Sequence, residues 1–152
     1  MTPKFPELGF YTLAGATDSP RDLIAEARDA EALGLGAMFI SERFNTKEAS
    51  TLSGAAAAVT ETLRIITAAT NHNTRHPMVT AAYATTMHRL SGGRFTLGIG
   101  RGMDRMFAAM AIPPITTAQM EDFVLVMRRL WQGETIIGHD GPIGRFPAMR
   151  LD

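Results

Sequence analysis

The stretch HRLSGGRFTLGIGRG, residues 88–102, joins the end of a helix to a strand and a glycine-rich loop. Ser91-Gly92-Gly93 ends the helix, because glycine tolerates the backbone angles of a helix C-terminus. The apolar segment 95–99 follows as a strand, and three glycines mark its carboxyl end. A helix that leads directly into a strand is one step of a βα repeat, and the same step recurs toward the N-terminus.

Three further apolar segments predict strands that start near residues 8, 37 and 64 and cover 8–13, 37–40 and 64–69. Helical periodicity between and after the strands predicts helices over 20–33, 50–62, 77–90 and 117–132. Strands alternating with helices at this spacing indicate βα units and a parallel sheet. Four such units form either a small open sheet or half of an eightfold barrel, which normally needs roughly 250 residues.

Local signals set the expected ends of these elements. Ser19 is a good N-cap for the first helix, Pro20 suits its first position, and Asp22 can answer the free amide groups there. Gly34 ends that helix. Near the C-terminus we expect a short strand at 135–137, followed by a turn in GHDGPIGRFP, residues 138–147.

Composition limits the class of protein. The 152 residues carry 15 basic and 15 acidic side chains, so zero net charge argues against binding to nucleic acid or to an anionic membrane surface. The sequence contains no run of 18 apolar residues, so it predicts no membrane-spanning helix. The chain has no cysteine, which excludes disulfides and is compatible with a cytoplasmic protein. We expect a single domain over residues 1–152.

Ligands of parallel α/β folds bind at the carboxyl ends of the strands, here segments 12–16, 41–44, 67–73 and 98–104. Glu42 could act there as an acid, a base or a hydrogen-bond acceptor, or could form an ion pair with an arginine at the rim. The glycines at 98, 100 and 102 could admit a flat or phosphorylated ligand or form only a tight turn. Arg101 and Asp104 could bind a ligand or pair with each other.

The four histidines do not form a known metal motif. His72 and His76 precede Pro77 in a loop, and no H-E-x-x-H pattern is present, so we expect no metal. We expect His72 to face the site, His76 to lie near a helix N-cap and His88 to lie on a helix surface. No G-x-S-x-G nucleophile elbow is present.

The motif of residues 88–102 resembles the luciferase-like monooxygenase superfamily, in which Leu-Ser-x-Gly-Arg leads into a strand ending in Gly-x-Gly. LVMRRLWQGE (125–134), ELGFYTLAG (7–15) and FISERF (39–44) are similar to the same family. The resemblance implies an α/β fold of the TIM (β/α)8-barrel type that binds FMN or the deazaflavin coenzyme F420. This chain would supply only the first four βα units, a half-barrel, and it looks more like the coenzyme F420-dependent branch.

The resemblance also implies roles for single residues. Glu42 is the candidate catalytic residue, although relatives often have histidine there, and the third strand would carry a non-prolyl cis peptide at Thr67-Ala68 that supports the ring. Arg101 stands where some dehydrogenase relatives have an acidic residue, which argues against their sugar-phosphate substrate. The residues expected to bind the cofactor are Ser41, Thr67, Ala68, Thr70, Ile99, Gly100, Arg101 and Asp104.

Three functions follow as hypotheses. The first is a coenzyme F420-dependent oxidoreductase that transfers a hydride to or from a small-molecule substrate. The second is an FMN-dependent monooxygenase. The third is a non-catalytic half-barrel that binds a cofactor or dimerises. Because a half-barrel has two open sheet edges, we also expect a homo-oligomer that assembles through them.

Overall fold

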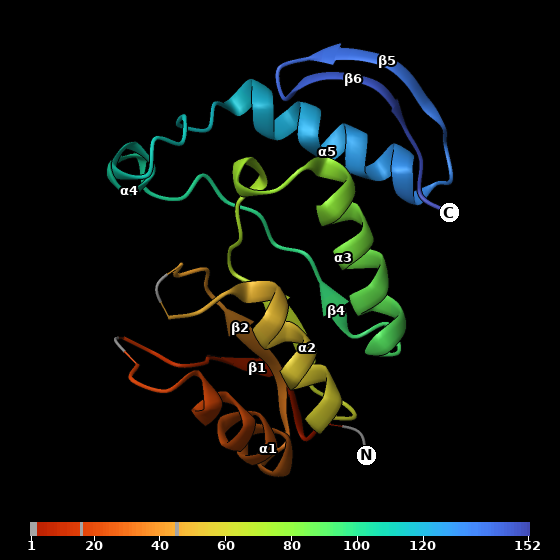
Figure 1. Ribbon diagram of the computed structural model, residues 1–152. Helices are drawn as coiled ribbons and strands as arrows, with labels where there is room; N and C mark the ends of the chain where they lie inside the picture. Colours follow the sequence, from red (N-terminus) through yellow and green to blue (C-terminus); the bar gives the residue numbers. More distant parts are fainter. Residues whose placement is uncertain (1–2, 16, 45) are drawn as a thin grey trace. The chain divides into compact units, whose positions relative to one another are not determined.

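The protein is represented by a computed structural model that describes residues 3–15, 17–44 and 46–152 (Figure 1). The chain folds as two compact units. The first comprises residues 1–70 and 86–99, and the second comprises residues 71–85 and 100–152. The expectation of a single domain over 1–152 stays a prediction.

Four parallel strands form the sheet of the first unit, in the order β1-β2-β3-β4. They are β1 (Phe5–Tyr11), β2 (Leu35–Ile40), β3 (Arg64–Thr67) and β4 (Phe95–Thr96). Parallel neighbours require crossover connections, usually helices. Helices α1 (Leu23–Leu33) and α2 (Ala49–Val59) supply the first two crossovers, as the alternating pattern predicted.

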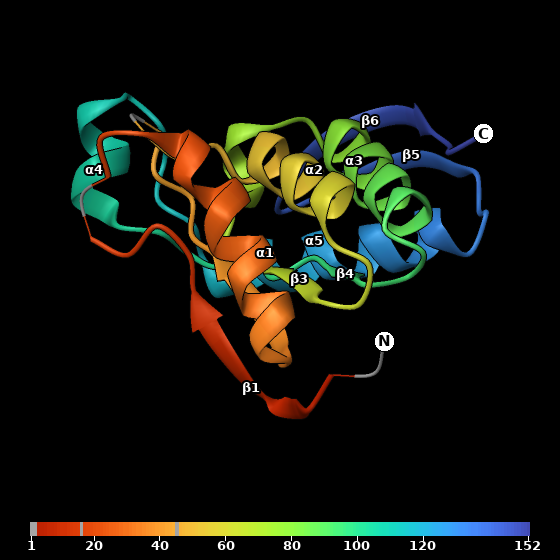
Figure 2. The same ribbon diagram turned by 90° about the horizontal axis from the view of Figure 1, so that it is seen from below.

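Helices α1 and α2 lie side by side along the strands (Figure 2). Their buried faces carry mostly small side chains, which lets the two helices approach closely. The buried residues on these faces are Leu23, Ala27 and Ala30 in α1, and Ala49, Leu52, Ser53, Ala56 and Ala57 in α2. α1 ends at Gly34, whose φ of 83° is the left-handed conformation expected of a C-terminal glycine.

The start of the first helix differs from the prediction. Residues 20–22 form a 3-10 turn, η1 (Pro20–Asp22), and the α-helix begins only at Leu23. Neither Ser19 nor Asp22 makes a side-chain capping bond, and the backbone carbonyl of Ser19 accepts from Asp22 N instead. The first strand also ends earlier than predicted, because Leu13 leaves the extended conformation with a φ of 49°.

The connector between α2 and β3 is held from both sides by charged side chains. Glu31 of α1 accepts hydrogen bonds from the backbone amides of residues 61–63 at 2.5–3.0 Å. Arg94 donates to the carbonyl oxygens of Thr60 at 2.8 Å and Leu63 at 2.7 Å. Burial by itself raises the pKa of Glu31, but the hydrogen bonds outweigh it and lower the pKa to about 2. The arginine of the Ser-Gly-Gly-Arg motif therefore stabilises the fold.

Helix α3 (Pro77–Leu90) contributes residues to both units, with the bounds that the sequence predicted. The second unit also contains a 3-10 turn η2 (His72–Thr74), a short helix α4 (Asp104–Ala109) and α5 (Thr117–Trp131). α5 begins with a capping box in which Thr116 and Gln119 bond to each other's backbone amides. The core of this unit contains Phe107, Phe123, Val126, Met127, Leu130, Ile136 and Met149.

The C-terminal residues form an antiparallel hairpin of β5 (Ile136–Gly141) and β6 (Gly144–Met149), so the prediction of one short strand followed by a turn is wrong. Glycine and proline cluster in this segment, but only the two residues between Gly141 and Gly144 make the turn. Asp122 of α5 fastens the hairpin, because its carboxylate accepts from Ile143 N at 3.0 Å and lies 3.2 Å from His139 Nε2. Helix α4 was not predicted either.

Candidate functional site

The carboxyl ends of β2 and β3 are joined through Glu42. Glu42 is 8% exposed, and its carboxylate accepts from Thr70 Oγ1 at 2.7 Å and from Ala49 N at 3.0 Å. Its backbone amide donates to the carbonyl of Ala69 at 3.3 Å. One buried side chain thus connects the ends of two strands and the first residue of α2.

Thr67 and Gly98 join the ends of β3 and β4. The Thr67 hydroxyl donates to the Gly98 carbonyl and accepts from the Gly98 amide, both at 2.8 Å. Thr70 N donates to the same carbonyl at 3.0 Å, and Thr70 pairs with Ile99 in an isolated parallel bridge. A Cβ on Gly98 would lie 2.0 Å from the Thr67 carbonyl oxygen. Glycine is required at 98 because a neighbouring strand approaches the backbone there.

A non-prolyl cis peptide follows β3, but it joins Ala68 to Ala69. The prediction of Thr67-Ala68 is therefore wrong by one residue. Thr67 still belongs to the ladder, paired with Ile40, and Ala68 N donates to the Ile40 carbonyl at 2.7 Å. The regular strand pairing with β2 therefore extends to Thr67 and the amide of Ala68, and the chain departs from it beyond that point.

Tyr11, at the end of β1, was not singled out from the sequence. Its hydroxyl donates to the Ala68 carbonyl, and its ring stacks on Phe39 of β2 at 6.1 Å between centroids. A tyrosine in an alternating strand resembles an ordinary packing residue, so only the three-dimensional structure reveals this bond. β1 is thereby linked to the segment after β3.

The first unit brings together most of the residues predicted for the site. The bonds described above connect five of these residues at the carboxyl ends of the strands: Glu42, Thr67, Ala68, Thr70 and Ile99. Ser41 is half-buried at the end of β2, directly before Glu42.

Gly100, Arg101 and Asp104 belong to the second unit. The Gly100 carbonyl accepts from Asn71 Nδ2 at 2.8 Å, and Arg101 donates to the Thr117 hydroxyl. Asp104 is exposed at the first position of α4. These contacts order the loop after β4 within its own unit.

The second unit has a pocket of about 240 Å³ whose lining includes His72, Asn73, Arg75, Gln119 and Phe123. The His72 ring stacks on Phe123 at 5.2 Å, and burial lowers its pKa. Nε2 of His72 and Oδ1 of Asn73 are buried with no hydrogen-bond partner among the described residues. The His72 imidazole is therefore a packed ring whose burial favours the neutral form.

The positions predicted for His76 and His88 are confirmed, while a place for His72 at the site stays a prediction. His76 Nδ1 accepts from Met78 N at 3.2 Å at the start of α3, and His88 is exposed near the end of that helix. Within the described ranges, no three His, Asp or Glu side chains are grouped as metal ligands. None of the described helices is both long enough and apolar enough to cross a bilayer.

Residues 6–151 match the family model described as luciferase-like monooxygenase. A 5,10-methylenetetrahydromethanopterin reductase of Methanolobus tindarius is 28% identical over 128 residues, which are 82% of this chain and 38% of the relative. An F420-dependent glucose-6-phosphate dehydrogenase of Beutenbergia cavernae is 30% identical over 139 residues, 83% of this chain and 41% of the relative. The chain thus spans about two fifths of the length of these curated relatives.

Solved structures agree on the fold. The coenzyme F420 dependent tetrahydromethanopterin reductase from Methanopyrus kandleri superposes with a TM-score of 0.78 at 20% identity, over 96% of this chain and 45% of that one. The oxygenating constituent of 3,6-diketocamphane monooxygenase from Pseudomonas putida, in complex with FMN, gives 0.76 at 21% identity, over 91% and 43%. The predicted fold class, the first four βα units of a luciferase-like barrel, is confirmed.

Proposed function

Because the chain belongs to the luciferase-like monooxygenase family, we propose that it forms the ring-binding part of a cytoplasmic, coenzyme F420-dependent oxidoreductase. The observation that carries the proposal is the linked set of Glu42, Ala68–Thr70 and Gly98–Ile99 at the carboxyl edge of the sheet. Ligands of such folds bind at this edge. Two of the similar proteins, the dehydrogenase of Beutenbergia cavernae and the reductase of Methanopyrus kandleri, are F420 dependent.

The segment after β3 suits a flat ring. Ala68 and Ala69 carry only methyl groups and are half-buried. Their carbonyl oxygens already accept from Tyr11 and from the amide of Glu42. With these polar atoms paired, the segment offers small apolar groups against which an aromatic face can lie. A deazaflavin, when bound, would exchange a hydride with the substrate through carbon 5 of its ring.

Glu42 serves this site as a hydrogen-bond partner in the proposal. Its two carboxylate oxygens accept from different groups, one on the segment after β3 and one at the start of α2. A carboxylate engaged in this way holds Thr70 in place beside the ring. Of the roles expected for Glu42, the geometry supports a hydrogen-bond acceptor better than an acid or a base.

The remaining contacts are proposed from the family resemblance. Ser41 directly precedes Glu42 of the linked set, and Ile99 belongs to that set. Gly100, Arg101 and Asp104 follow β4 and would contact the cofactor beyond its ring. The substrate is a small molecule that meets the exposed face of the ring.

The second candidate function is an FMN-dependent monooxygenase. The similarity to the FMN complex from Pseudomonas putida favours it, with a TM-score close to that of the reductase. A flat flavin ring would meet the same alanine segment. Oxygen consumption separates the two, because deazaflavins react poorly with oxygen.

The third candidate is a cofactor-binding half-barrel without catalysis. β1 and β4 are the terminal strands of the four-stranded sheet. Terminal strands present backbone groups that can pair with another chain. We propose that the 152-residue chain forms a homo-oligomer through these strands, and light scattering measures this directly.

The test is a fluorescence titration of the purified 152-residue chain with coenzyme F420 and, separately, with FMN. The proposal predicts that F420 binds with a Kd in the micromolar range or below, which corresponds to a binding free energy of about 8 kcal/mol or more. It also predicts that F420 binds more tightly than FMN. Tighter FMN binding would favour the monooxygenase, and binding of neither would refute a ring site on this chain.

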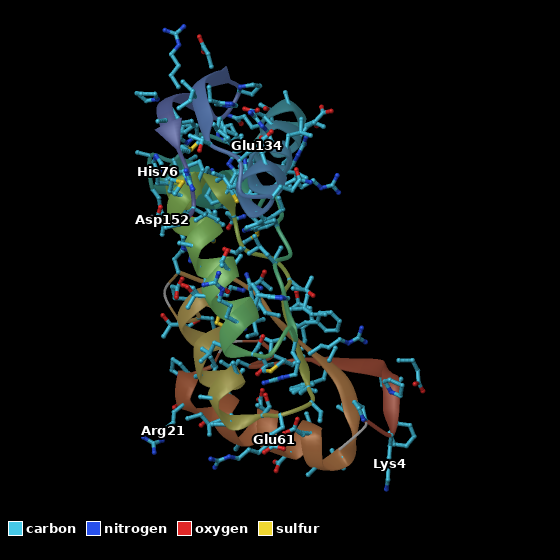
Figure 3. The ribbon with its side chains drawn as sticks, turned by 90° about the vertical axis from the view of Figure 1, so that its right-hand side faces the viewer. Lys4, Arg21, Glu61, His76, Glu134 and Asp152 are labelled. Carbon is cyan, nitrogen blue, oxygen red and sulfur yellow. The ribbon has the colours of Figure 1, made fainter. Side chains whose placement is uncertain are left out.

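Glu42→Gln is the site variant, with Glu61→Gln as its matched control. An amide offers one acceptor oxygen where the carboxylate serves two donors, so Glu42→Gln is expected to weaken F420 binding. Glu61 has an exposed side chain on the α2–β3 connector (Figure 3), so its variant is expected to bind normally. Equal affinities of the two variants would remove Glu42 from the site.

A further inference from the structure

Leu13 lies two residues after the end of β1 and has an unusual backbone conformation. Its φ is 49°, in the left-handed region that residues other than glycine, asparagine and aspartate rarely adopt. The residue is only 2% exposed, so its side chain belongs to the core. Non-glycine residues persist in this region where their surroundings hold them, and such positions cluster at functional sites.

Glu26 holds the Leu13 backbone from one side. Its Oε2 accepts from Leu13 N at 2.8 Å and from the hydroxyl of Thr12 at 2.6 Å. Thr12 is fully buried, and its amide extends the strand ladder by donating to the Phe39 carbonyl at 3.1 Å. Glu26 therefore binds the chain at the exact point where it leaves the sheet.

Lys47 holds the same residue from the other side. It is 2% exposed, and its Nζ donates to the Leu13 carbonyl at 2.5 Å. A turn positions it, because the backbones of Arg43 and Lys47 exchange hydrogen bonds at 2.7 and 2.8 Å. Burying an ammonium group costs free energy unless it is hydrogen bonded and charge-compensated. Burial lowers the pKa of this amine, and the charge of Glu26 opposes that change.

Thr12, Leu13, Glu26 and Lys47, which we call the Leu13 clamp, lie at the carboxyl end of β1. Tyr11, the residue just before the clamp, donates to the Ala68 carbonyl of the proposed ring-binding segment. Ala14 and Gly15, just after it, are exposed. The clamp thus lies where β1 ends and the exposed loop begins.

We infer that Glu26 and Lys47 are positioning residues that fix the left-handed turn at Leu13, and with it the loop that borders the cofactor site. The inference rests on the proposed function, because it assigns the clamp to that same site. The inference requires no contact between either side chain and the ring. Each acts through the Leu13 backbone, one on its amide and the other on its carbonyl.

Lys47→Met tests the inference, and the sequence offers a matched control. The chain has two lysines, and the other, Lys4, is exposed and points away from the fold in Figure 3. Lys47→Met is expected to weaken F420 binding about tenfold, equivalent to ~1.4 kcal/mol, while Lys4→Met changes it less than about twofold. The Leu13 amide is expected to exchange its hydrogen about tenfold faster in Lys47→Met.

Two further variants separate positioning from mere stability. Glu31→Gln is expected to weaken the same unit at the α2–β3 connector and not at the clamp. At a temperature where all variants are folded, it is expected to bind F420 like the wild type. Leu13→Gly adopts a positive φ without steric cost. Adding Lys47→Met to Leu13→Gly is therefore expected to cost less than about threefold in affinity.

The outcomes distinguish this inference from the proposed function. Wild-type binding with unchanged affinity in Lys47→Met overturns the clamp alone. Equal losses in Lys47→Met and Glu31→Gln also overturn it, since the effect would then be one of stability. A wild-type chain that binds neither F420 nor FMN overturns the proposed function and the ligand role of the clamp, whatever the exchange rate at Leu13.

Discussion

Replacing Arg94 by methionine tests the idea that this arginine stabilises the fold. The guanidinium donates to three oxygens of the α2–β3 connector and to one of α2. They are Thr60 Oγ1, Thr60 O and Leu63 O at 3.0 Å or less, and Ala57 O at 3.4 Å. The carbonyls at the end of α2 have no partner within the helix, so Arg94 satisfies groups that would otherwise be left unpaired. Methionine keeps much of the side-chain volume and removes every donor.

The expected loss is about 3–5 kcal/mol. A hydrogen bond from a charged donor contributes about 1.5–3 kcal/mol, and four bonds that share one group do not add fully. Domains are typically stable by about 5–15 kcal/mol, so the variant is expected to be partly unfolded under mild denaturation. Arg94→Lys can still reach one or two of the oxygens and is expected to lose about 1–3 kcal/mol.

Urea unfolding followed by far-UV circular dichroism measures the loss, and hydrogen exchange at residues 60–63 locates it. Arg89→Met is the control, because Arg89 is an exposed arginine near the end of α3. Its variant is expected to change stability by less than about 0.5 kcal/mol. A loss below about 1 kcal/mol in Arg94→Met would show that the connector does not depend on these bonds.

Three other changes have defined outcomes. The pKa of Glu31 is lowered to about 2 in the fold, below its ordinary 4.5, so its stabilisation is complete above about pH 4.5 and is lost as the pH falls toward 2. Glu31→Gln is therefore expected to lower the free energy of unfolding by about 2 kcal/mol at pH 7, a value already reduced for partial solvation of the carboxylate, and by little near pH 2. Parallel acid-unfolding curves of the variant and the wild type would contradict this. Gly98→Ala places a methyl group 2.0 Å from the Thr67 carbonyl oxygen and is expected to destabilise the fold by about 3 kcal/mol or more. Urea unfolding measures this loss, and a fully stable variant would disprove the close approach. Thr116→Ala removes the capping box with Gln119 and is expected to lower stability by about 1 kcal/mol, and an unchanged thermal midpoint would argue against that cap.

Much of the candidate site could be placed from the sequence because the carboxyl ends of parallel strands share one edge. That rule identified the segments containing Glu42, Thr70 and Ile99 before any coordinates were known. It did not identify their bonding, since the two oxygens of Glu42 find their partners 7 and 28 residues away. Tyr11 was missed because a tyrosine in a strand resembles an ordinary packing residue. Glu26 and Lys47 were missed because charged residues in a helix or loop usually face solvent.

The sequence by itself determined the βα alternation, the parallel sheet and the family. Apolar periodicity and helix-ending glycines are local signals, and they act on the backbone wherever the chain goes. The bounds of α3 and the end of α1 at Gly34 follow from such signals alone.

Only the tertiary structure decided how strand ends and charged side chains are used. The hairpin at 136–149 forms because Ile136 and Met149 are buried in the core of the second unit, in spite of its turn-like composition. Leu13 takes a left-handed conformation because Glu26 and Lys47, 13 and 34 residues away, bind its amide and carbonyl. Hydrogen bonds between groups that are distant in sequence depend on the whole fold, and no local pattern of residues encodes them.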